Sequence, residues 1–369
     1  MKVAIVHERF TELGGAERVV EAMHEIWPGA TIHAPLVDRA ALPAGLRDAD
    51  VRTTPLQRLY RGGPGYAHLL PLLPLAMARI DLSGVDLVVT SHHAFANRVR
   101  PPAGVPMVSY THTPARWMWE PAMRAKEIGG PVGRAGLAAF AATQRGPDAA
   151  AAARLTAIVA NSRHVVARVG RWWGRDATVV APPADVHRYT PDPAVAREDF
   201  FLFAGRLAPY KRADLAATAA RAAGARLVVA GEGRGRRELE EMRWPGLELL
   251  GRVDDATLLD LYRRCRALVF PHEEDFGIVP VEAQACGTPV VALGYGGALD
   301  TVVDGVTGVL FHADRPGGEA GALAEVLRSF DDARFDPEVV RAHAMTFSSD
   351  AFRARFAAKV EEALTGVGT

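Results

Sequence analysis

The chain has 369 residues, 49% hydrophobic and 23% charged, with 43 Lys and Arg against 43 Asp and Glu. This length suits two domains of about 150–180 residues each, and the composition excludes a disordered chain. Because the formal net charge is zero, no bulk field draws the chain to nucleic acid or to an acidic membrane.

Only two cysteines occur, Cys265 and Cys286, which argues against a disulfide scaffold and fits a reducing compartment. The chain enters the strand-like run Lys2–His7 directly, without a signal-peptide pattern. The longest apolar stretch, His68–Ile80, contains two prolines and falls short of the roughly 20 residues needed to cross a bilayer. The sequence therefore predicts a cytoplasmic protein, at most peripheral at the inner face of a membrane.

Short apolar runs alternate with helix-like segments along the whole chain. Near-continuous Val, Ile, Leu and Ala runs are typical of parallel strands covered on both faces, and the alternation predicts doubly wound α/β sheets. The expected strands are Lys2–His7, Asp86–Ser91, Pro106–His112, Ala157–Asn161, Thr178–Ala181, Phe200–Ala204, Arg226–Ala230, Leu247–Leu250, Ala267–Phe270, Pro289–Ala292 and Val309–Phe311. The clearest expected helices are Ala16–Trp27, Ala135–Ala153 and Ser348–Leu364.

A break falls at Pro182-Pro183 and in the loop through Pro191 and Pro193, after which the strand–helix pattern starts again. The sequence therefore predicts an N-terminal domain over residues 1–183 and a second domain over residues 184–349.

The first glycine-rich motif, Gly14-Gly15, follows the first strand and precedes a helix. Glycines there let the backbone approach a ligand closely and offer it N–H groups. An ordinary tight turn is the alternative. The G-x-G-x-x-G fingerprint of a nicotinamide dehydrogenase is missing at this position.

Two cations, Arg206 and Lys211, follow the first strand of the second half, near an expected helix start at Lys211. The helix dipole disfavours cations at that end, so the pair favours an anion held between them. A solvated basic loop is the alternative.

The most informative stretch runs from Pro271 to Ala292, with a helix expected to begin near Pro280. Its free backbone N–H groups would form an anion site. Glu274 and Glu282 frame this element, and a carboxylate placed like Glu282 can accept both hydrogen bonds of a ribose diol. The alternative is two solvated acids on a helix face.

Together these residues resemble the retaining glycosyltransferases of family 4, which have the GT-B fold. The matching motifs are Gly14-Gly15, Ala160–Ser162, Gly205–Lys211, Gly231–Gly233, Gly251–Val253, Glu274–Glu282 with Phe276-Gly277, Gly287–Pro289 and Phe347–Ser349. The stretches Asp81–His92 and Thr111–Glu120 resemble a subgroup rich in mannosyltransferases. The chain departs from the family pattern at Asp275, where glycine is frequent, and at Asp300, where glutamate is more usual.

The resemblance implies two Rossmann-like domains facing a cleft, with the helix from about residue 350 crossing back onto the N-terminal, acceptor-side domain. Arg206 and Lys211 would hold the donor diphosphate and stabilise the departing charge, Glu282 would bind the ribose, and His112 would face the sugar. A lone histidine is otherwise more often structural. The remaining donor-binding residues implied are Gly14, Gly15, Glu232, Arg252, Val253, Glu274, Asp275, Phe276, Gly277 and Ile278.

The expected activity is retaining transfer of a hexose, mannose from GDP-mannose, to a glycan, a lipid-linked sugar or a small molecule. No metal or other cofactor is expected, because no His, Asp or Glu cluster has metal spacing and His92-His93 face opposite sides of a strand. Cationic side chains and helix N-termini would stabilise the leaving diphosphate instead. A nucleotide-sugar epimerase and a non-catalytic nucleotide-sugar binder remain alternatives. No nucleic-acid partner is expected.

The segment from Leu56 to Ile80 carries Arg58, Arg61 and several leucines. It could form a surface that meets a lipid-linked acceptor and touches the membrane. A pair of core helices broken by prolines is an equal alternative.

Overall fold

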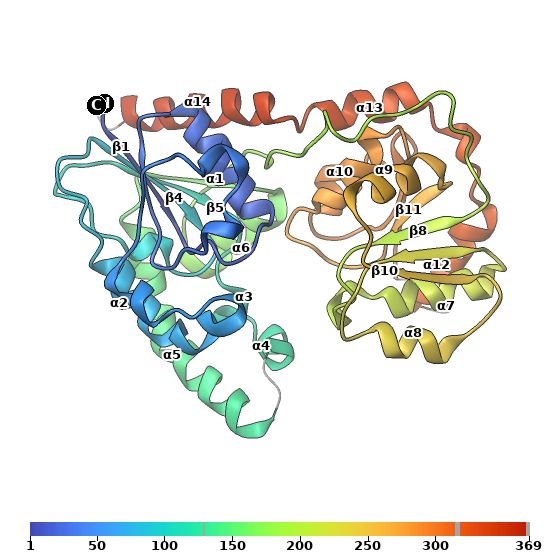
Figure 1. The fold of residues 1–369 in the computed structure, drawn as a ribbon, viewed down its shortest axis with the longest axis horizontal. Helices are drawn as coiled ribbons and strands as arrows, with labels where there is room; N and C mark the ends of the chain where they lie inside the picture. Colours follow the sequence, from blue (N-terminus) through green and yellow to red (C-terminus); the bar gives the residue numbers. More distant parts are fainter. Residues whose placement is uncertain (128–129, 314–317, 367–369) are drawn as a thin grey trace. The chain divides into compact units, whose positions relative to one another are not determined.

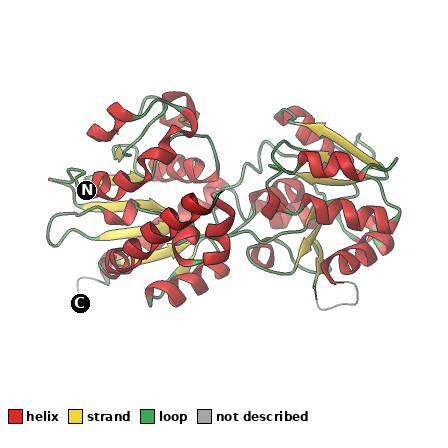
Figure 2. Cartoon of the chain, turned by 90° about the horizontal axis from the view of Figure 1, so that it is seen from below, coloured by secondary structure: helices red, strands yellow, loops and turns green. Residues whose placement is uncertain are grey.

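The computed structural model describes residues 1–127, 130–313 and 318–366. The chain divides into two compact units (Figures 1 and 2). The first comprises residues 1–183 and 349–369, and the second comprises residues 184–348.

The first unit holds a seven-stranded parallel sheet in the order β3-β2-β1-β4-β5-β6-β7. The order reverses between β1 and β4, which makes their carboxyl ends the topological switch point. Its strands are β1 (Val3–His7), β2 (Thr31–His33), β3 (Val51–Arg52), β4 (Leu87–His92), β5 (Met107–Thr111), β6 (Ala157–Ala160) and β7 (Thr178–Val179). Its helices are α1 (Gly15–Ile26), α2 (Leu73–Ala78), α3 (Arg116–Trp119), α4 (Pro121–Glu127), α5 (Pro131–Ala153), α6 (Arg163–Trp173) and α14 (Ser349–Thr365).

Both faces of this sheet are buried, as its apolar strands require. In β1, Ala4 and Val6 pack with α2, α5 and α6, whereas Val3 and Ile5 pack with α1 and α14. Strand side chains alternate between faces, so each strand feeds both cores. The consequence for function is that the last residue of each strand also has a defined face.

The C-terminal helix α14 packs beside α1 on the first sheet (Figure 1). The ring of Tyr110 on β5 meets Phe352 and Phe356 edge-on, at centroid distances of 5.4 and 5.6 Å. These three side chains are almost completely buried. The expectation that the last helix belongs with the N-terminal sheet is confirmed.

The second unit holds a six-stranded parallel sheet in the order β10-β9-β8-β11-β12-β13, with its switch point between β8 and β11. Its strands are β8 (Phe201–Ala204), β9 (Leu227–Ala230), β10 (Leu247–Gly251), β11 (Ala267–Phe270), β12 (Val290–Leu293) and β13 (Gly308–Phe311). Its helices are α7 (Ala213–Ala223), α8 (Arg236–Met242), α9 (Asp255–Arg264), α10 (Ile278–Ala285), α11 (Ala298–Thr301), α12 (Gly318–Ser329) and α13 (Pro337–Met345). In Figure 1, α7, α8 and α12 lie on one side of this sheet, and α9 and α10 lie on the other.

The GT-B fold class is confirmed, and each of the eleven expected strands forms, with ends that differ by at most two residues. Two strands were missed, β2 and β3, because three and two residues are too few to show a periodicity. Helix α10 begins at Ile278, two residues before Pro280. Lys211 ends a 3₁₀ turn, and the left-handed residue Arg212 (φ 54°) separates that turn from α7.

Candidate active site

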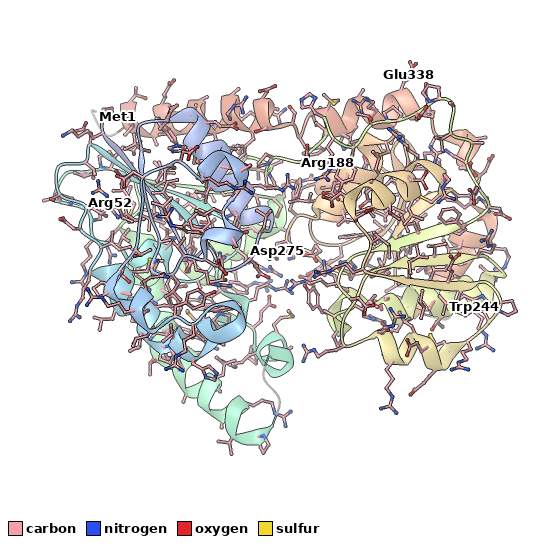
Figure 3. The ribbon with its side chains drawn as sticks, viewed as in Figure 1. Met1, Arg52, Arg188, Trp244, Asp275 and Glu338 are labelled. Carbon is pink, nitrogen blue, oxygen red and sulfur yellow. The ribbon has the colours of Figure 1, made fainter. Side chains whose placement is uncertain are left out.

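In the second unit, the sequence-predicted residues gather where β8 and β11 end. Gly205 and Arg206 follow β8, and the loop from Pro271 to Gly277 follows β11. These strands are neighbours at the point where the strand order reverses, and open parallel sheets bind ligands in the crevice there. Asp275 is labelled on this loop in Figure 3.

Lys211 Nζ forms an ion pair with Glu274 Oε1, and His272 Nε2 lies 3.3 Å from the same oxygen. The Lys211 and Glu274 side chains are only 16% and 21% exposed. Burial alone would raise the pKa of the Glu274 carboxyl, but His272 and Lys211 lower it from 4.5 to about 2. Glu274 is therefore an anion at neutral pH.

A glycine pair fixes the loop that carries Glu274. The Gly297 N–H donates to the Glu274 carbonyl at 2.8 Å. A Cβ on Gly297 would lie 2.3 Å from the backbone of Phe276, so no larger residue fits there. Phe276 is buried and meets the ring of Phe347 at 5.6 Å. The loop is thus held on both sides, which gives the carboxylate a defined place.

Helix α10 begins directly after this loop. Gly277 has φ 92°, a left-handed conformation that turns the chain into the helix. The N–H groups of Ile278 and Val279 have no partner within the helix, and Pro280 has no N–H. Neither N–H has another partner in the part of the chain that the structure describes, so the helix start presents two donors and a positive dipole end to an anion.

Glu282 lies about one turn into α10, where the hydroxyl of Tyr262 donates to its Oε2 at 3.2 Å. Tyr262 is completely buried, and burial raises the pKa of its hydroxyl well above the usual value. The hydroxyl therefore stays protonated and orients the carboxylate.

Three strand-end loops stack beside β8. Gly231 approaches Gly205 so closely that a Cβ would lie 1.8 Å from the Gly205 carbonyl oxygen. The Leu207 N–H donates to the Glu232 carbonyl at 2.8 Å, and the Gly231 N–H donates to the Gly251 carbonyl at 2.7 Å. This packing brings the Glu232 loop and the loop before Arg252 together.

The side chains on these loops differ in their exposure and in whether they are paired. Glu232 is half exposed and pairs with Arg236 at 2.6 Å. Arg252 is exposed, and Val253 is partly buried. Arg206 is also exposed, and its side chain makes no hydrogen bond or ion pair with any described residue. Arg206 and Lys211 are thus on one loop but in different environments, since only Lys211 is paired.

Gly14, Gly15 and His112 belong to the first unit. The Gly14 N–H donates to Glu17 Oε2 at 2.9 Å, so this group is engaged in capping α1. Gly14 has φ −142°, an extended conformation open to any residue. Of the two glycines, Gly15 is the one whose N–H, at the helix start, has no intrahelical partner.

His112 directly follows β5 and joins a cluster of polar side chains at the strand ends. Its Nε2 lies 2.8 Å from Ser91 Oγ, which lies 3.1 Å from His7 Nδ1. His7 Nε2 lies 3.4 Å from Glu17 Oε1. Burial, assisted by the nearby His7, lowers the pKa of His112 to about 3, so its ring is neutral at physiological pH.

Sequence reasoning missed five residues that the structure places beside the predicted ones: His7, Glu17, Ser91, Tyr262 and His272. A usable signal existed for two of them. His7 and Ser91 are polar residues at the ends of apolar parallel strands, where ligands bind in such sheets.

Among residues 1–127, 130–313 and 318–366, no group of three His, Cys, Asp or Glu side chains could hold a metal ion. No helix within the same ranges is long and apolar enough to cross a membrane.

Residues 191–334 match a family described as "Glycosyl transferases group 1". The chain is 37% identical over 212 residues to a D-inositol 3-phosphate glycosyltransferase of Mycolicibacterium gilvum, covering 52% of this chain and 46% of that protein. It is 32% identical over 236 residues to the protein of the same name from Segniliparus rotundus, covering 57% of this chain and 53% of that protein. The chain thus spans about half the length of these curated relatives. Their names do not support the narrower resemblance to mannosyltransferases.

Two solved structures share the fold over almost the whole chain. Anabaena HepE in complex with UDP matches at a TM-score of 0.69 and 19% identity, covering 98% of this chain and all of that one. Sucrose-phosphate synthase from Thermosynechococcus elongatus matches at a TM-score of 0.70 and 16% identity, covering 99% of this chain and all of that one. Residues 191–334 are therefore similar to the group 1 glycosyltransferases, and the chain as a whole has the GT-B fold.

Proposed function

We propose that the chain is a retaining, metal-independent hexosyltransferase that uses a nucleoside-diphosphate sugar. The observation that carries this proposal is the Lys211–Glu274 ion pair beside the start of α10. A cation, an anion and free N–H groups converge there at the switch point of the sheet.

In this proposal the donor diphosphate replaces Glu274 as the partner of Lys211. It also contacts Arg206 and the N–H groups of Ile278 and Val279. Two side-chain cations and a helix dipole supply the charge that a metal ion supplies elsewhere, and they stabilise the leaving nucleoside diphosphate. Glu274, released from Lys211, then accepts hydrogen bonds from hydroxyls of the transferred sugar, together with the backbone of Asp275 to Ile278.

Glu282 binds the ribose. Its carboxylate can accept both hydrogen bonds of a diol, and the Tyr262 hydroxyl contact supports a fixed orientation. The base lies against the stacked loops that carry Glu232, Arg252 and Val253.

A UDP-linked hexose is better supported as the donor than GDP-mannose. Anabaena HepE, whose fold this chain shares, has been solved with UDP and with UDP-glucose. The two reported relatives are named for D-inositol 3-phosphate, not for mannose. We therefore take a UDP-hexose as the first candidate and GDP-mannose as the second.

The first unit serves the acceptor side of the reaction, with His112 and Gly15 at the transferred sugar. It carries 24 Lys and Arg against 17 Asp and Glu, a net charge of +7, whereas the second unit carries 19 against 26, a net charge of −7. The positive unit favours an acceptor that bears phosphate, and the relatives' names point the same way.

A membrane contact fits the same unit. Residues 51–80 contain four arginines and no acidic residue. Leu59, Leu72 and Leu75 are 60%, 43% and 51% exposed, whereas Leu73 and Met77 are buried in the core. The segment thus combines a core-facing side with an exposed basic and apolar side, the composition that binds anionic lipid surfaces.

The test is release of free nucleoside diphosphate from UDP-glucose and GDP-mannose, with and without inositol phosphate, in excess EDTA. A transferase releases nucleoside diphosphate and needs an acceptor. An epimerase turns over the donor without an acceptor, and a non-catalytic binder shows no turnover. Activity that is lost in EDTA and restored by Mg²⁺ or Mn²⁺ would contradict metal independence.

A further inference from the structure

We propose that Glu17, His7 and Ser91 form a hydrogen-bond relay that holds His112 in one tautomer and orientation, with its Nδ1 lone pair presented to the substrate. The three are positioning residues, because each acts through His112. This inference rests on the proposed function for its kinetic consequence, but its structural content concerns the ring alone.

The relay follows from strand alternation. Ile5 on β1, Val89 on β4 and Tyr110 on β5 pack on the sheet face that α1 and α14 cover. Two residues further along, each strand returns to the same face, which places His7, Ser91 and His112 side by side. Glu17 reaches them from the first turn of α1.

Glu17 sets the proposed direction of the hydrogen bonds along the relay, because a carboxylate only accepts. Burial would raise the pKa of Glu17, but the contacts with His7 and Gly14 lower it below 4.5, so Glu17 is an ionised acceptor. We propose that His7 donates through Nε2–H to Glu17 and accepts the Ser91 hydroxyl proton at Nδ1, as one tautomer of its ring allows. Ser91 Oγ then accepts from Nε2–H of His112.

The remaining ring nitrogen of His112, Nδ1, therefore carries a lone pair. It has no hydrogen-bond partner among the described residues, and it is not one of the fully enclosed polar atoms. The ring plane is fixed by Tyr110, which meets it edge-on at 5.2 Å, and the Asn161 side chain donates to the His112 carbonyl at 2.9 Å. The geometry presents one oriented acceptor.

The chemistry such an acceptor selects is a hydroxyl group, since a neutral imidazole lone pair takes a proton from a donor and repels an oxyanion. A sugar hydroxyl fits, and a phosphate oxygen does not. The relay residues Glu17, His7 and Ser91 are 6%, 0% and 0% exposed, so none of them can meet the substrate directly.

The experiment compares Ser91→Ala with Thr90→Val. Thr90 is the neighbouring residue on β4, is equally buried, and donates a side-chain hydrogen bond to Asn97 at 2.6 Å on the other face of the sheet. Thr90→Val therefore removes a buried hydroxyl without touching the relay. The readouts are kcat, KM for the donor, melting temperature and the ¹⁵N chemical shifts of the His112 ring.

We expect wild-type His112 to show the Nε2–H tautomer, and Ser91→Ala to show a mixture of both. Ser91→Ala should lower kcat about tenfold with KM for the donor little changed, whereas Thr90→Val should change mainly the melting temperature. Ser91→Thr, which retains the hydroxyl, should restore most of kcat. Equal kcat losses in the alanine and valine variants, or an Nδ1–H tautomer in the wild-type protein, would overturn the relay.

The ring measurement separates this inference from the proposed function. If the wild-type protein turns over no nucleotide sugar, the proposed function fails, while the tautomer of His112 in the wild-type and Ser91→Ala proteins still decides the relay. If Ser91→Ala does not fold, Glu17→Gln tests the other end of the relay by the same shifts.

Discussion

Lys211 and Glu274, which are 63 residues apart in the chain, form a part-buried ion pair across the ends of β8 and β11. Each group is one that the proposed donor would need. Under the proposed function, a diphosphate that binds Lys211 would displace Glu274, and the freed carboxylate would become available to the sugar. The pair thus holds both groups in place before the donor binds.

The first prediction concerns the cations. Replacing Lys211 or Arg206 by alanine should lower turnover by roughly 10²–10³-fold, since each variant removes about 3–4 kcal/mol of leaving-group stabilisation. Steady-state rates and melting temperatures check this. Arg237→Ala is the control, because Arg237 is 88% exposed on α8 and pairs only with Glu241 among the described residues. Wild-type turnover in a folded Lys211→Ala protein would show that Lys211 does not hold the diphosphate.

The second prediction is a pH dependence of stability. The pKa of Glu274 is depressed to about 2 in the folded protein, from 4.5. A carboxyl group whose pKa is lower in the folded than in the unfolded state stabilises the protein fully at pH values above the unfolded-state pKa. This stabilisation is lost as the pH falls from 4.5 to about 2. The melting temperature of the wild type should therefore fall more steeply over this range than that of Glu274→Gln. Parallel curves for the two proteins would contradict the assignment.

How much of this could be predicted from sequence depends on the kind of feature. The β8 and β11 loops were found because glycines and charges follow apolar strands, a local pattern. The partner of Lys211 was not, since an ion pair over 63 residues depends on which strands are neighbours. His7 and Ser91 carry a local signal, since each is a polar residue at the end of an apolar strand, but their contact with His112 needs the strand order β1-β4-β5, which no single segment encodes.

The left-handed Arg212 illustrates a second limit. A helix beginning near Lys211 was the natural expectation, because nothing in the local sequence marks a break. The structure instead holds Arg212 at φ 54°, with its guanidinium paired to Glu319 at 2.8 Å. A tertiary contact thus accompanies a backbone conformation that an arginine rarely adopts.

The third prediction concerns nucleotide binding. Glu282→Ala should weaken the binding of UDP and of GDP by similar factors, about tenfold, because we propose that the carboxylate binds the ribose and not the base. Tyr262→Phe should have a smaller effect in the same direction, as it removes only the orienting hydroxyl. Calorimetry with both nucleotides measures this, and UDP should give the larger thermal shift on the wild type. A larger rise in melting temperature with GDP would favour GDP-mannose as the donor.

The fourth prediction tests the basic, apolar segment of the first unit. The protein should sediment with vesicles containing phosphatidylglycerol but not with pure phosphatidylcholine vesicles. Arg58→Glu with Arg61→Glu should abolish this binding, since each arginine near an anionic surface contributes about 1 kcal/mol. Arg237→Glu, on the second unit, should leave it unchanged. Equal loss in both proteins would show a general charge effect and no localised surface.

The last prediction is His112 itself. We propose that its ring touches the transferred sugar, while the nucleotide is held by residues of the second unit. His112→Ala should then lower kcat by about 10² or more with the UDP affinity unchanged, the sign of an interaction made mainly in the transition state. A purely structural histidine would instead lower the melting temperature without a selective effect on rate. His24→Ala is the control, because His24 lies in the last turn of α1 in the same unit.

The pKa of His112, about 3, adds a pH criterion, because the ring stays neutral over an assay range of about pH 5 to 9. Any change of rate over that range should therefore be the same with and without His112. Turnover, UDP affinity and melting temperature are best measured on one preparation of each variant. Near-normal turnover in a well-folded His112→Ala protein would remove His112 from the site.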